Sequence, residues 1–306
     1  MTNTNGGSGA TCHVGIDIGG SAAKLGALDG NDRILWEDAV ATPAHAEAVD
    51  VLDAVAERVS RQGGDIVSIG VGLPGALDRE RGVIDVSPNL PWLRGVPMRE
   101  ELGRRLGFEP ARIRLENDAN VAALGECRFG GGRDHPDMLF VTLGTGVGSG
   151  LVLGGRLHVG AGLACEIGHL CVEPDGRECG CGSRGCLETI ASASAARRFA
   201  EEAGLPKGHP GDLELLTAQS RAAAGPEREL LERVGRNLGH GLAVVVVLVD
   251  VRTFVFGGGF SAALDVLRPG IEAGIAERSF GERAFELLPA TLGNAAGWMG
   301  AATLGA

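Results

Sequence analysis

The sequence lacks any apolar run long enough to cross a membrane. Its longest run, Leu242 to Val249, is far shorter than the ~20 apolar residues that a membrane helix needs. Basic residues are also scarce, since 28 Lys and Arg face 39 Asp and Glu and leave a net charge of -11. Such a surface repels a phosphate backbone, so no nucleic-acid partner is expected. No Gly-x-y period runs through the chain, which excludes a collagen-like fibre.

The first ten residues are small and polar, so no signal peptide is expected and we expect a cytoplasmic protein. Seven cysteines in a reducing compartment indicate metal binding or free thiols rather than a disulfide framework. The length of 306 residues suits one large domain or two ordinary ones.

Glycine clusters separate the apolar runs of the chain. Residues 13–28 and 138–153 each read as strand, glycine turn and strand, which we interpret as two related halves with a cleft between them. The further predicted strands are 66–71, 113–115 and 253–256. Helices are predicted over 46–61, 98–106, 119–126, 230–249 and 294–304.

Two glycine turns follow buried strands. Asp17 precedes Gly19-Gly20-Ser21, and Gly144-Thr145-Gly146 ends the later strand. Their N–H groups can cradle phosphate and Asp17 can hold Mg²⁺, although an ordinary hairpin turn explains each motif equally well. The glycines after Asp17 open a strand and not a helix, so this turn is neither a Rossmann loop nor a Walker loop. Gly257-Gly258-Gly259 is either a further turn or a platform for adenosine.

The run Glu116-Asn117-Asp118-Ala119-Asn120 stands between a predicted strand and a predicted helix. A helix cap explains one Asn or Asp there. Four polar residues in five exceed that need, and an Asp facing a cleft could accept a proton from a substrate hydroxyl. Glu116 points the other way in this reading and is structural.

The cysteine pattern near residue 180 is the most specific signal. Cys179, Cys181 and Cys186 form a tight knuckle, and His169 completes a Cys₃His set typical of structural zinc. Glu166 and Glu188 flank this set, and two carboxylates with an imidazole suit a polyhydroxylated ligand. The remaining cysteines lack ligand spacing and are interpreted as small buried hydrophobes: Cys12, Cys127, Cys165 and Cys171.

On these motifs the chain resembles the ROK family of sugar kinases, in particular its bacterial glucokinases, from His13 to the C-terminus. The run from Glu166 to Glu188 fits the family signature E-x-G-H and C-x-C-G-x-x-G-C-x-E. The resemblance implies an actin-like ATPase (ribonuclease H-like) fold with two α/β domains around a central cleft. Residues 1–118 plus 293–306 would form the small domain, and 119–292 the large domain with the knuckle.

The resemblance also implies roles for single residues. Asp118 would be the catalytic base that takes the proton from the 6-hydroxyl of the sugar. The sugar would be bound by Gly75, Asn89, Asn117, Glu166, His169 and Glu188. ATP and Mg²⁺ would be bound by Asp17, Gly19, Gly20, Ser21, Lys24, Gly144, Thr145, Gly146, Gly257, Gly258 and Gly259. Structural zinc would be held by His169, Cys179, Cys181 and Cys186.

The chain departs from the common family pattern at two places. Ser21 follows the double glycine and the lysine comes later, at Lys24, an arrangement that also resembles polyphosphate-using members. Those members generally lack the knuckle, so ATP is the expected donor. Cys165 stands where a glycine often precedes the pocket glutamate, and its thiol could tune the site or make it sensitive to alkylation.

The function expected from the resemblance is phosphorylation of glucose to glucose 6-phosphate by a cytoplasmic homodimer. Kinases for N-acetylglucosamine, N-acetylmannosamine, fructose or allose remain alternatives, because the Glu-x-Gly-His set suits several sugars. A non-catalytic sugar-binding regulator is the alternative of another class. A DNA-binding regulator of the family carries a helix-turn-helix before the sugar fold, and about a dozen residues before the first strand are too few for one.

Overall fold

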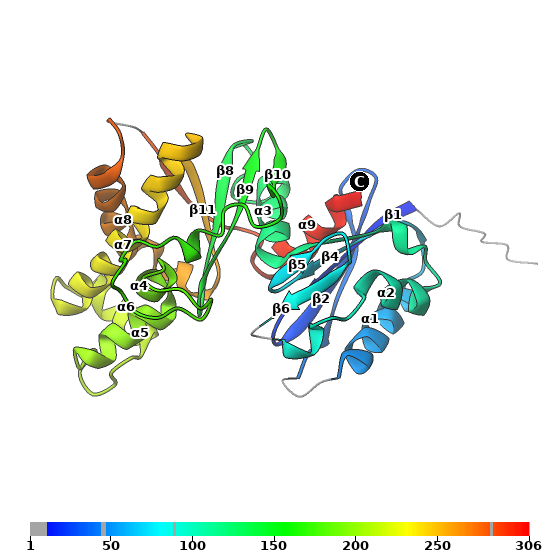
Figure 1. The fold of residues 1–306 in the computed structure, drawn as a ribbon, viewed down its shortest axis with the longest axis horizontal. Coiled ribbons are helices and arrows are strands. Elements are labelled where there is room, and N and C mark those ends of the chain that lie inside the picture. Colours follow the sequence, from blue (N-terminus) through cyan, green and yellow to red (C-terminus); the bar gives the residue numbers. More distant parts are fainter. Residues whose placement is uncertain (1–10, 44–46, 88–89, 282–283, 306) are drawn as a thin grey trace, which may run out of the picture. The chain divides into compact units, whose positions relative to one another are not determined.

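The computed structural model describes residues 11–43, 47–87, 90–281 and 284–305 (Figure 1). It divides into two compact units. The first contains Met1–Arg128, Gly160–Leu163 and Asn294–Ala306, and the second contains Phe129–Val159 and Ala164–Gly293. The helix after residue 118 falls in the first unit, whereas the sequence-based division gave it to the second; that division stays a prediction.

The first unit is built on a five-stranded sheet in the order β3-β2-β1-β4-β7. Its strands are β1 (Thr11–Ile18), β2 (Ala22–Asp29), β3 (Ile34–Ala41), β4 (Asp65–Leu73) and β7 (Ile113–Asn117). β1, β2 and β3 are antiparallel neighbours, whereas β4 and β7 run parallel to β1. A small hairpin joins β5 (Ala76–Asp78) to β6 (Val83–Val86).

The helices of the first unit are α1 (Ala48–Gln62), α2 (Met98–Leu106), α3 (Asp118–Phe129) and α9 (Ala296–Ala302). The spacing that predicts α1 is confirmed, because its buried face consists of Val51, Leu52, Val55, Ala56 and Val59. The closing helix α9, drawn in red in Figure 1, packs with its backbone against the sheet. A Cβ atom at Gly15 would lie 1.8 Å from the carbonyl oxygen of Trp298, so β1 needs glycine there.

The second unit repeats the sheet topology of the first. Its sheet has the order β10-β9-β8-β11-β12, with an antiparallel trio followed by two parallel strands. The strands are β8 (Met138–Leu143), β9 (Val147–Leu153), β10 (Arg156–His158), β11 (Thr253–Gly257) and β12 (Glu286–Pro289). The two glycine hairpins occupy the same place in both sheets, which confirms the related halves inferred from the sequence.

The helices of the second unit are α4 (Glu188–Ala191), α5 (Ala193–Glu202), α6 (Leu213–Ala222), α7 (Pro226–Val249) and α8 (Leu264–Arg278). α7 and α8 run in the same direction and approach closely at glycines. A Cβ at Gly235 would lie 2.2 Å from the Leu267 carbonyl oxygen, and one at Gly239 would lie 2.3 Å from that of Ile271. The predicted long helix is thus confirmed as α7, which has a buried partner along its length.

Short 3₁₀ turns complete the chain: η1 (Pro91–Leu93), η2 (Pro110–Arg112), η3 (Ile167–His169), η4 (Gly259–Ala263), η5 (Gly293–Ala295) and η6 (Thr303–Gly305). Each unit has its own apolar core on its sheet. Among the described residues, no helix combines the length and the hydropathy needed to span a bilayer.

Candidate active site

The carboxyl edge of the first sheet brings two acidic side chains together. Asp17 on β1 pairs with Gly72 on β4, which pairs with Glu116 on β7, and Asp118 follows β7 directly as the first residue of α3. Parallel strands end at one edge, which is where ligands of open α/β sheets bind. Burial and then the charge of Asp118 raise the pKa of Asp17 to about 7, whereas Lys24 lowers it.

Asn117 caps α3. Its Oδ1 accepts hydrogen bonds from the N–H groups of Ala119 and Asn120 at 2.9 and 3.2 Å, the two amides that a capping side chain satisfies. Asp118 Oδ1 accepts from Ala119 as well, at 2.9 Å. Because Asn117 already meets both amides, capping does not explain the acidic residue beside it.

Glu116 serves the structure, as its predicted orientation implied. It is buried and forms an ion pair with Arg79, whose Nε lies 2.9 Å from Glu116 Oε2. Its Oε1 also accepts hydrogen bonds from Asn117 N and Asn120 Nδ2, each at 2.8 Å. Arg79 also donates a hydrogen bond to the Gly162 carbonyl oxygen at 2.9 Å. This bond connects the segment Gly160–Leu163 to the rest of the first unit.

Gly75 lies near the α3 cap. Its φ is +113°, and a Cβ at this position would lie only 2.1 Å from the Val86 carbonyl oxygen, so both the backbone conformation and the close approach demand glycine. Asn117 Nδ2 donates to the Gly75 carbonyl oxygen at 3.4 Å. Asn89, the other asparagine predicted to contact sugar, lies outside the described residues.

The turn after β1 presents open backbone. The Thr42 hydroxyl stabilises this turn by donating a hydrogen bond to the Gly19 carbonyl oxygen at 2.6 Å. Gly20 and Ser21 are exposed, and a Cβ at Gly20 would meet nothing within 4 Å, so an anion can approach the backbone. Lys24 Nζ donates to Asn294 Oδ1 at 2.9 Å, which fixes the lysine beside the strand end.

The corresponding turn of the second unit follows β8. Gly144 N–H donates to the Gly146 carbonyl oxygen at 3.0 Å, and a Cβ at Gly144 would meet nothing within 4 Å. β11 runs parallel to β8, with Gly257 opposite Thr142. The turns 144–146 and 257–259 therefore leave the same edge of the second sheet, as one bound nucleotide would require.

Glu188 joins this turn to the cysteine knuckle. Its Oε2 accepts a hydrogen bond from Val147 N at 3.1 Å and would lie 2.1 Å from a Cβ at Gly146. Its other oxygen lies 3.9 Å from Cys179 Sγ. The sequence assigned Glu188 to the sugar alone, and the structure adds these two contacts.

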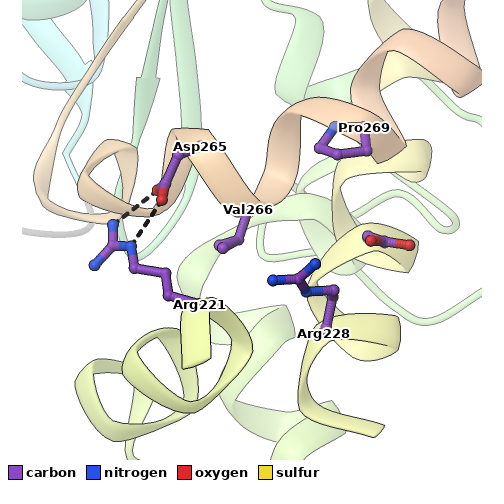
Figure 2. A pocket seen from close by; sticks show the side chains of 6 residues that line it. Arg221, Arg228, Asp265, Val266 and Pro269 are labelled. Atoms are coloured by element: carbon purple, nitrogen blue, oxygen red, sulfur yellow. Dashed lines mark hydrogen bonds and ion pairs between the residues drawn. The ribbon is translucent and has the colours of Figure 1, made fainter. Parts of the chain in front are cut away.

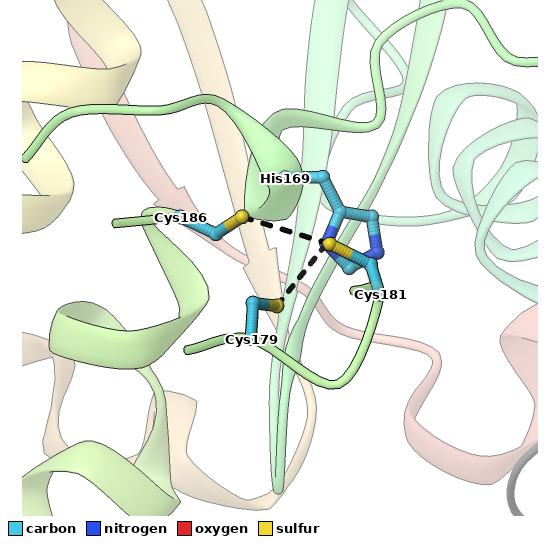
Figure 3. Close-up of side chains that lie close together, drawn as sticks. All are labelled: His169, Cys179, Cys181 and Cys186. Carbon is cyan, nitrogen blue, oxygen red and sulfur yellow. Dashed lines mark hydrogen bonds between the residues drawn. The ribbon is translucent and has the colours of Figure 1, made fainter. Parts of the chain in front are cut away.

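The knuckle gathers its four predicted ligands (Figure 3). The ligand atoms of His169, Cys179, Cys181 and Cys186 all lie within 4.8 Å of one another. Cys181 and Cys186 have their sulfurs 3.7 Å apart, and Cys179 Sγ lies 3.8 Å from His169 Nδ1. A tetrahedron with Zn–S bonds of about 2.3 Å has edges of about 3.8 Å, so the spacing fits zinc.

The thiols of the knuckle need a cation to ionise together. Burial raises the pKa of Cys186 to about 12, and the neighbouring Cys181 and Cys179 add to this. Burial also raises the pKa of Cys179, whereas the Ser183 backbone N–H lowers the pKa of Cys181. A divalent metal ion would offset the cost of three adjacent thiolates.

Glu166 and His169 lie in one turn packed on β9. His169 N–H donates to the Glu166 carbonyl oxygen at 3.0 Å, and Gly168 allows a contact with the Val147 carbonyl oxygen that any Cβ would block. Cys165 has a φ of +62°, a left-handed conformation that favours glycine. This explains why a glycine suits the position that Cys165 occupies here.

The prediction for the remaining cysteines is wrong at Cys171. Cys12 and Cys127 are buried as expected, and Cys165 is partly buried, but Cys171 is exposed. Cys171 lies on a short ladder, where it forms an antiparallel bridge with the buried Cys186.

One cavity of about 400 Å³ lies at the N-terminal ends of α7 and α8 (Figure 2). It is lined by Arg221, Arg228, Glu232, Asp265, Val266 and Pro269. Arg221 donates to both Asp265 oxygens at 2.8 Å and to the Ala262 carbonyl oxygen at 2.6 Å. α8 follows the turn 257–259 through η4, and Arg221 contacts η4 at Ala262, so η4 connects the cavity to the predicted adenosine motif. No sequence signal singled out these residues.

Comparison with known proteins identifies the family. The sequence profile of the ROK family matches residues 13–306. The glucokinase of Streptomyces coelicolor is 36% identical over 312 residues, covering 95% of this chain and 96% of the relative. The structure resembles the ROK hexokinase from Thermus thermophilus, with a TM-score of 0.81, 35% identity and coverage of 95% and 96%.

It also resembles a ROK family glucokinase from Streptomyces griseus in complex with glucose and AMPPNP. That similarity has a TM-score of 0.78 and 34% identity, and it covers 96% of this chain and 98% of the other. The chain belongs to the ROK family and has the actin-like ATPase fold.

Proposed function

We propose that this chain is an ATP-dependent glucokinase, which transfers the γ-phosphoryl group of ATP to the 6-hydroxyl of glucose. One observation carries the proposal. Asp17 and Asp118 meet at the sheet edge beside the open turn 19–21, in a chain that resembles a glucokinase over 95% of its length. Phosphoryl transfer consists mainly of positioning and charge stabilisation, so a base, a metal carboxylate and backbone amides are the parts it requires.

Asp118 is the proposed general base. It stands at the first turn of α3, where Asn117 already provides the cap, so its carboxylate is oriented by the helix. It would accept the proton of the 6-hydroxyl as that oxygen attacks the phosphorus atom in line with the leaving group.

Asp17 is the proposed carboxylate for Mg²⁺. The donor chemistry fits, because a hard cation favours oxygen ligands and two neighbouring carboxylates repel each other without one. Gly297 leaves room for the side chain, since a Cβ there would lie 2.2 Å from Asp17 Oδ2. When bound, Mg²⁺ neutralises phosphate charge.

Sugar recognition is assigned to a set of polar groups. Glu166, His169 and Glu188 would bind the ring hydroxyls, and the zinc knuckle would hold its ligand His169 in place. Asn117, Gly75 and the undescribed Asn89 are further proposed contacts. A zinc ion with four protein ligands has no open position, so its contribution is structural.

The turns 19–21, 144–146 and 257–259 are the proposed nucleotide site, with Lys24 beside the first turn. We assign the adenine ring to the cavity in Figure 2, because it adjoins η4 and holds the planar guanidinium of Arg221 in a fixed orientation. A cation over an aromatic ring favours such binding. Polyphosphate has no base to fill this cavity, which favours ATP as the donor.

A homodimer in the cytoplasm is the proposed state. The end of α7 exposes Val247, Leu248 and Val249 by 57%, 73% and 39%, and Phe280 just after the parallel helix α8 is 84% exposed. An apolar patch of this kind marks an interface. Leu248→Glu should give a monomer in sedimentation, and an unchanged mass would refute this interface.

A coupled phosphoryl-transfer assay tests the function. Glucose, N-acetylglucosamine, N-acetylmannosamine, fructose and allose would each be offered with MgATP and with polyphosphate. We expect turnover with glucose and MgATP to exceed every other pair. Preferred turnover of another sugar would overturn the choice of glucose, and sugar binding without turnover would support the regulator instead.

A further inference from the structure

The short surface ladder beside the zinc knuckle places an exposed thiol opposite a ligand thiol. Cys171 and Cys186 form an isolated antiparallel bridge. The flanking residues make the hydrogen bonds, since Val172 N–H donates to Gly185 O at 2.9 Å and Leu187 N–H donates to Leu170 O at 2.8 Å. Cys171 and Cys186 are therefore the non-hydrogen-bonded pair, whose side chains project from the same face.

This geometry suits a disulfide without any rearrangement of the backbone. A non-hydrogen-bonded pair has a Cα–Cα distance of about 4.5 Å, and disulfides accept about 4.4–6.8 Å. The hydrogen bond between Leu187 N–H and Leu170 O is compatible with a disulfide, because the disulfide joins side chains and not backbone groups. Cys171 is not among the four metal ligands, so it is a spare thiol beside them.

We propose that Cys171 and Cys186 form a reversible disulfide that removes Cys186 from the metal set and releases zinc, so that the knuckle acts as a peroxide-sensitive switch. The inference rests on the zinc knuckle of the proposed function. Cys171 is the point of entry because it is exposed and is not a ligand. Cys181 is exposed too but belongs to the metal set, whereas Cys186 is fully buried and Cys165 is partly buried beside Glu166.

The chemistry uses one hydrogen peroxide and two thiols. Peroxide oxidises the Cys171 thiol to a sulfenic acid and leaves as one water. The Cys186 sulfur, leaving zinc as a thiolate, attacks the sulfenic sulfur, and the expelled hydroxide takes a proton to give a second water. Both electrons come from the two sulfurs. His169, Cys179 and Cys181 then remain as an incomplete set, which binds zinc less tightly.

Loss of the metal would reach the site through Glu188. This residue follows Cys186 by two positions and contacts both Val147 N and the Cys179 sulfur. Freed from zinc, the knuckle no longer fixes His169 or the short backbone segment from Cys186 to Glu188, so affinity for sugar falls. A dithiol with added zinc would restore it, because reduction returns both thiols.

The test uses the reduced, zinc-loaded protein, Cys171→Ser and, as a matched control, Cys165→Ser, which removes another thiol that is not a ligand. Each protein receives a small molar excess of hydrogen peroxide. Released zinc is followed with a metallochromic dye, and disulfides are mapped by mass spectrometry after the free thiols are blocked. Wild type and Cys165→Ser should release zinc and show a disulfide between Cys171 and Cys186. Cys171→Ser should release zinc at a rate at least about tenfold lower.

Equal release from wild type and Cys171→Ser would overturn the proposal. So would a mapped bond from Cys186 to Cys181 or Cys179, or a zinc content that is already lowered in reduced Cys171→Ser. Zinc content and glucose turnover of the reduced wild type are measured first. Reduced protein without zinc would refute the knuckle and the switch together, whereas zinc-loaded protein that prefers another sugar would refute only the choice of substrate.

Discussion

Asp17→Asn should stabilise the first unit and inactivate the enzyme. Burial and the charge of Asp118 raise the pKa of Asp17 from 3.8 to about 7. Between these values the folded protein binds a proton that the unfolded chain has lost, so this group stabilises the fold at low pH and the stability is lost as pH rises toward 7. At about 1.36 kcal/mol per pKa unit, the loss amounts to about 4 kcal/mol above pH 7.

Asparagine carries no charge at any of these pH values, so the variant escapes this loss. Urea unfolding in Mg²⁺-free buffer, followed by tryptophan fluorescence, would measure the unfolding free energy of the variant and of the wild type. The three tryptophans, Trp36, Trp92 and Trp298, all belong to the first unit, so their fluorescence reports on the right part of the chain. The difference in unfolding free energy between variant and wild type should grow by about 3 kcal/mol from about pH 5 to about pH 8.

Asp29→Asn is the matched control in the same hairpin. Hydrogen bonds from the Arg33 and Asn31 backbone lower the pKa of Asp29, so its charged form stabilises the fold and its loss should bring no gain at high pH. A difference for Asp17→Asn that stays constant over this pH range would refute the reasoning, because it would show that Asp17 titrates normally.

The other predictions concern the chemistry and the two ligands. Asp118→Asn should lower kcat by about 10²–10⁴ while calorimetric glucose affinity stays within a few fold, and near-normal kcat would contradict the assignment of the base. Cys181→Ser should lose zinc by metal analysis and raise the KM for glucose about tenfold, and normal zinc content would contradict the ligand set. Arg221→Ala should raise the KM for ATP about 3- to 10-fold, because a cation–π contact with adenine is lost, and should leave the KM for glucose unchanged. Equal effects on both KM values would contradict the assignment of adenine to the cavity.

Local sequence signals predicted the parts of the fold that depend on local chemistry. Both glycine hairpins were predictable because each joins an apolar strand to a turn that needs open backbone. α1 followed from its apolar spacing. α8 was missed because Pro269 and Gly270 interrupt the helical pattern. The glycine is explained only by the tertiary contact, since a Cβ there would lie 1.9 Å from the Glu232 carbonyl oxygen on α7.

In the candidate site, too, the features set by local sequence were predictable and those set by tertiary contacts were not. The knuckle was predictable because metal ligands in one loop leave a spacing that is read directly from the sequence. The pairing of Cys171 with Cys186 joins residues 15 positions apart in the chain, and the cavity depends on three helices meeting, so neither follows from local spacing. Arginines and an aspartate on helices resemble an ordinary solvated surface, so no periodicity distinguished Arg221 or Asp265.

Glu188 connects the knuckle to the turn that follows β8. One carboxylate contacts the turn that would bind phosphate, through Val147, and also a knuckle thiol, Cys179. Gly146 is glycine because this carboxylate fills the space of a side chain. Within the second unit, the knuckle, the proposed sugar ligands and the turn that follows β8 are therefore connected through Glu188. This connection is the route by which the proposed oxidation of Cys186 would reach that turn without involving Asp118.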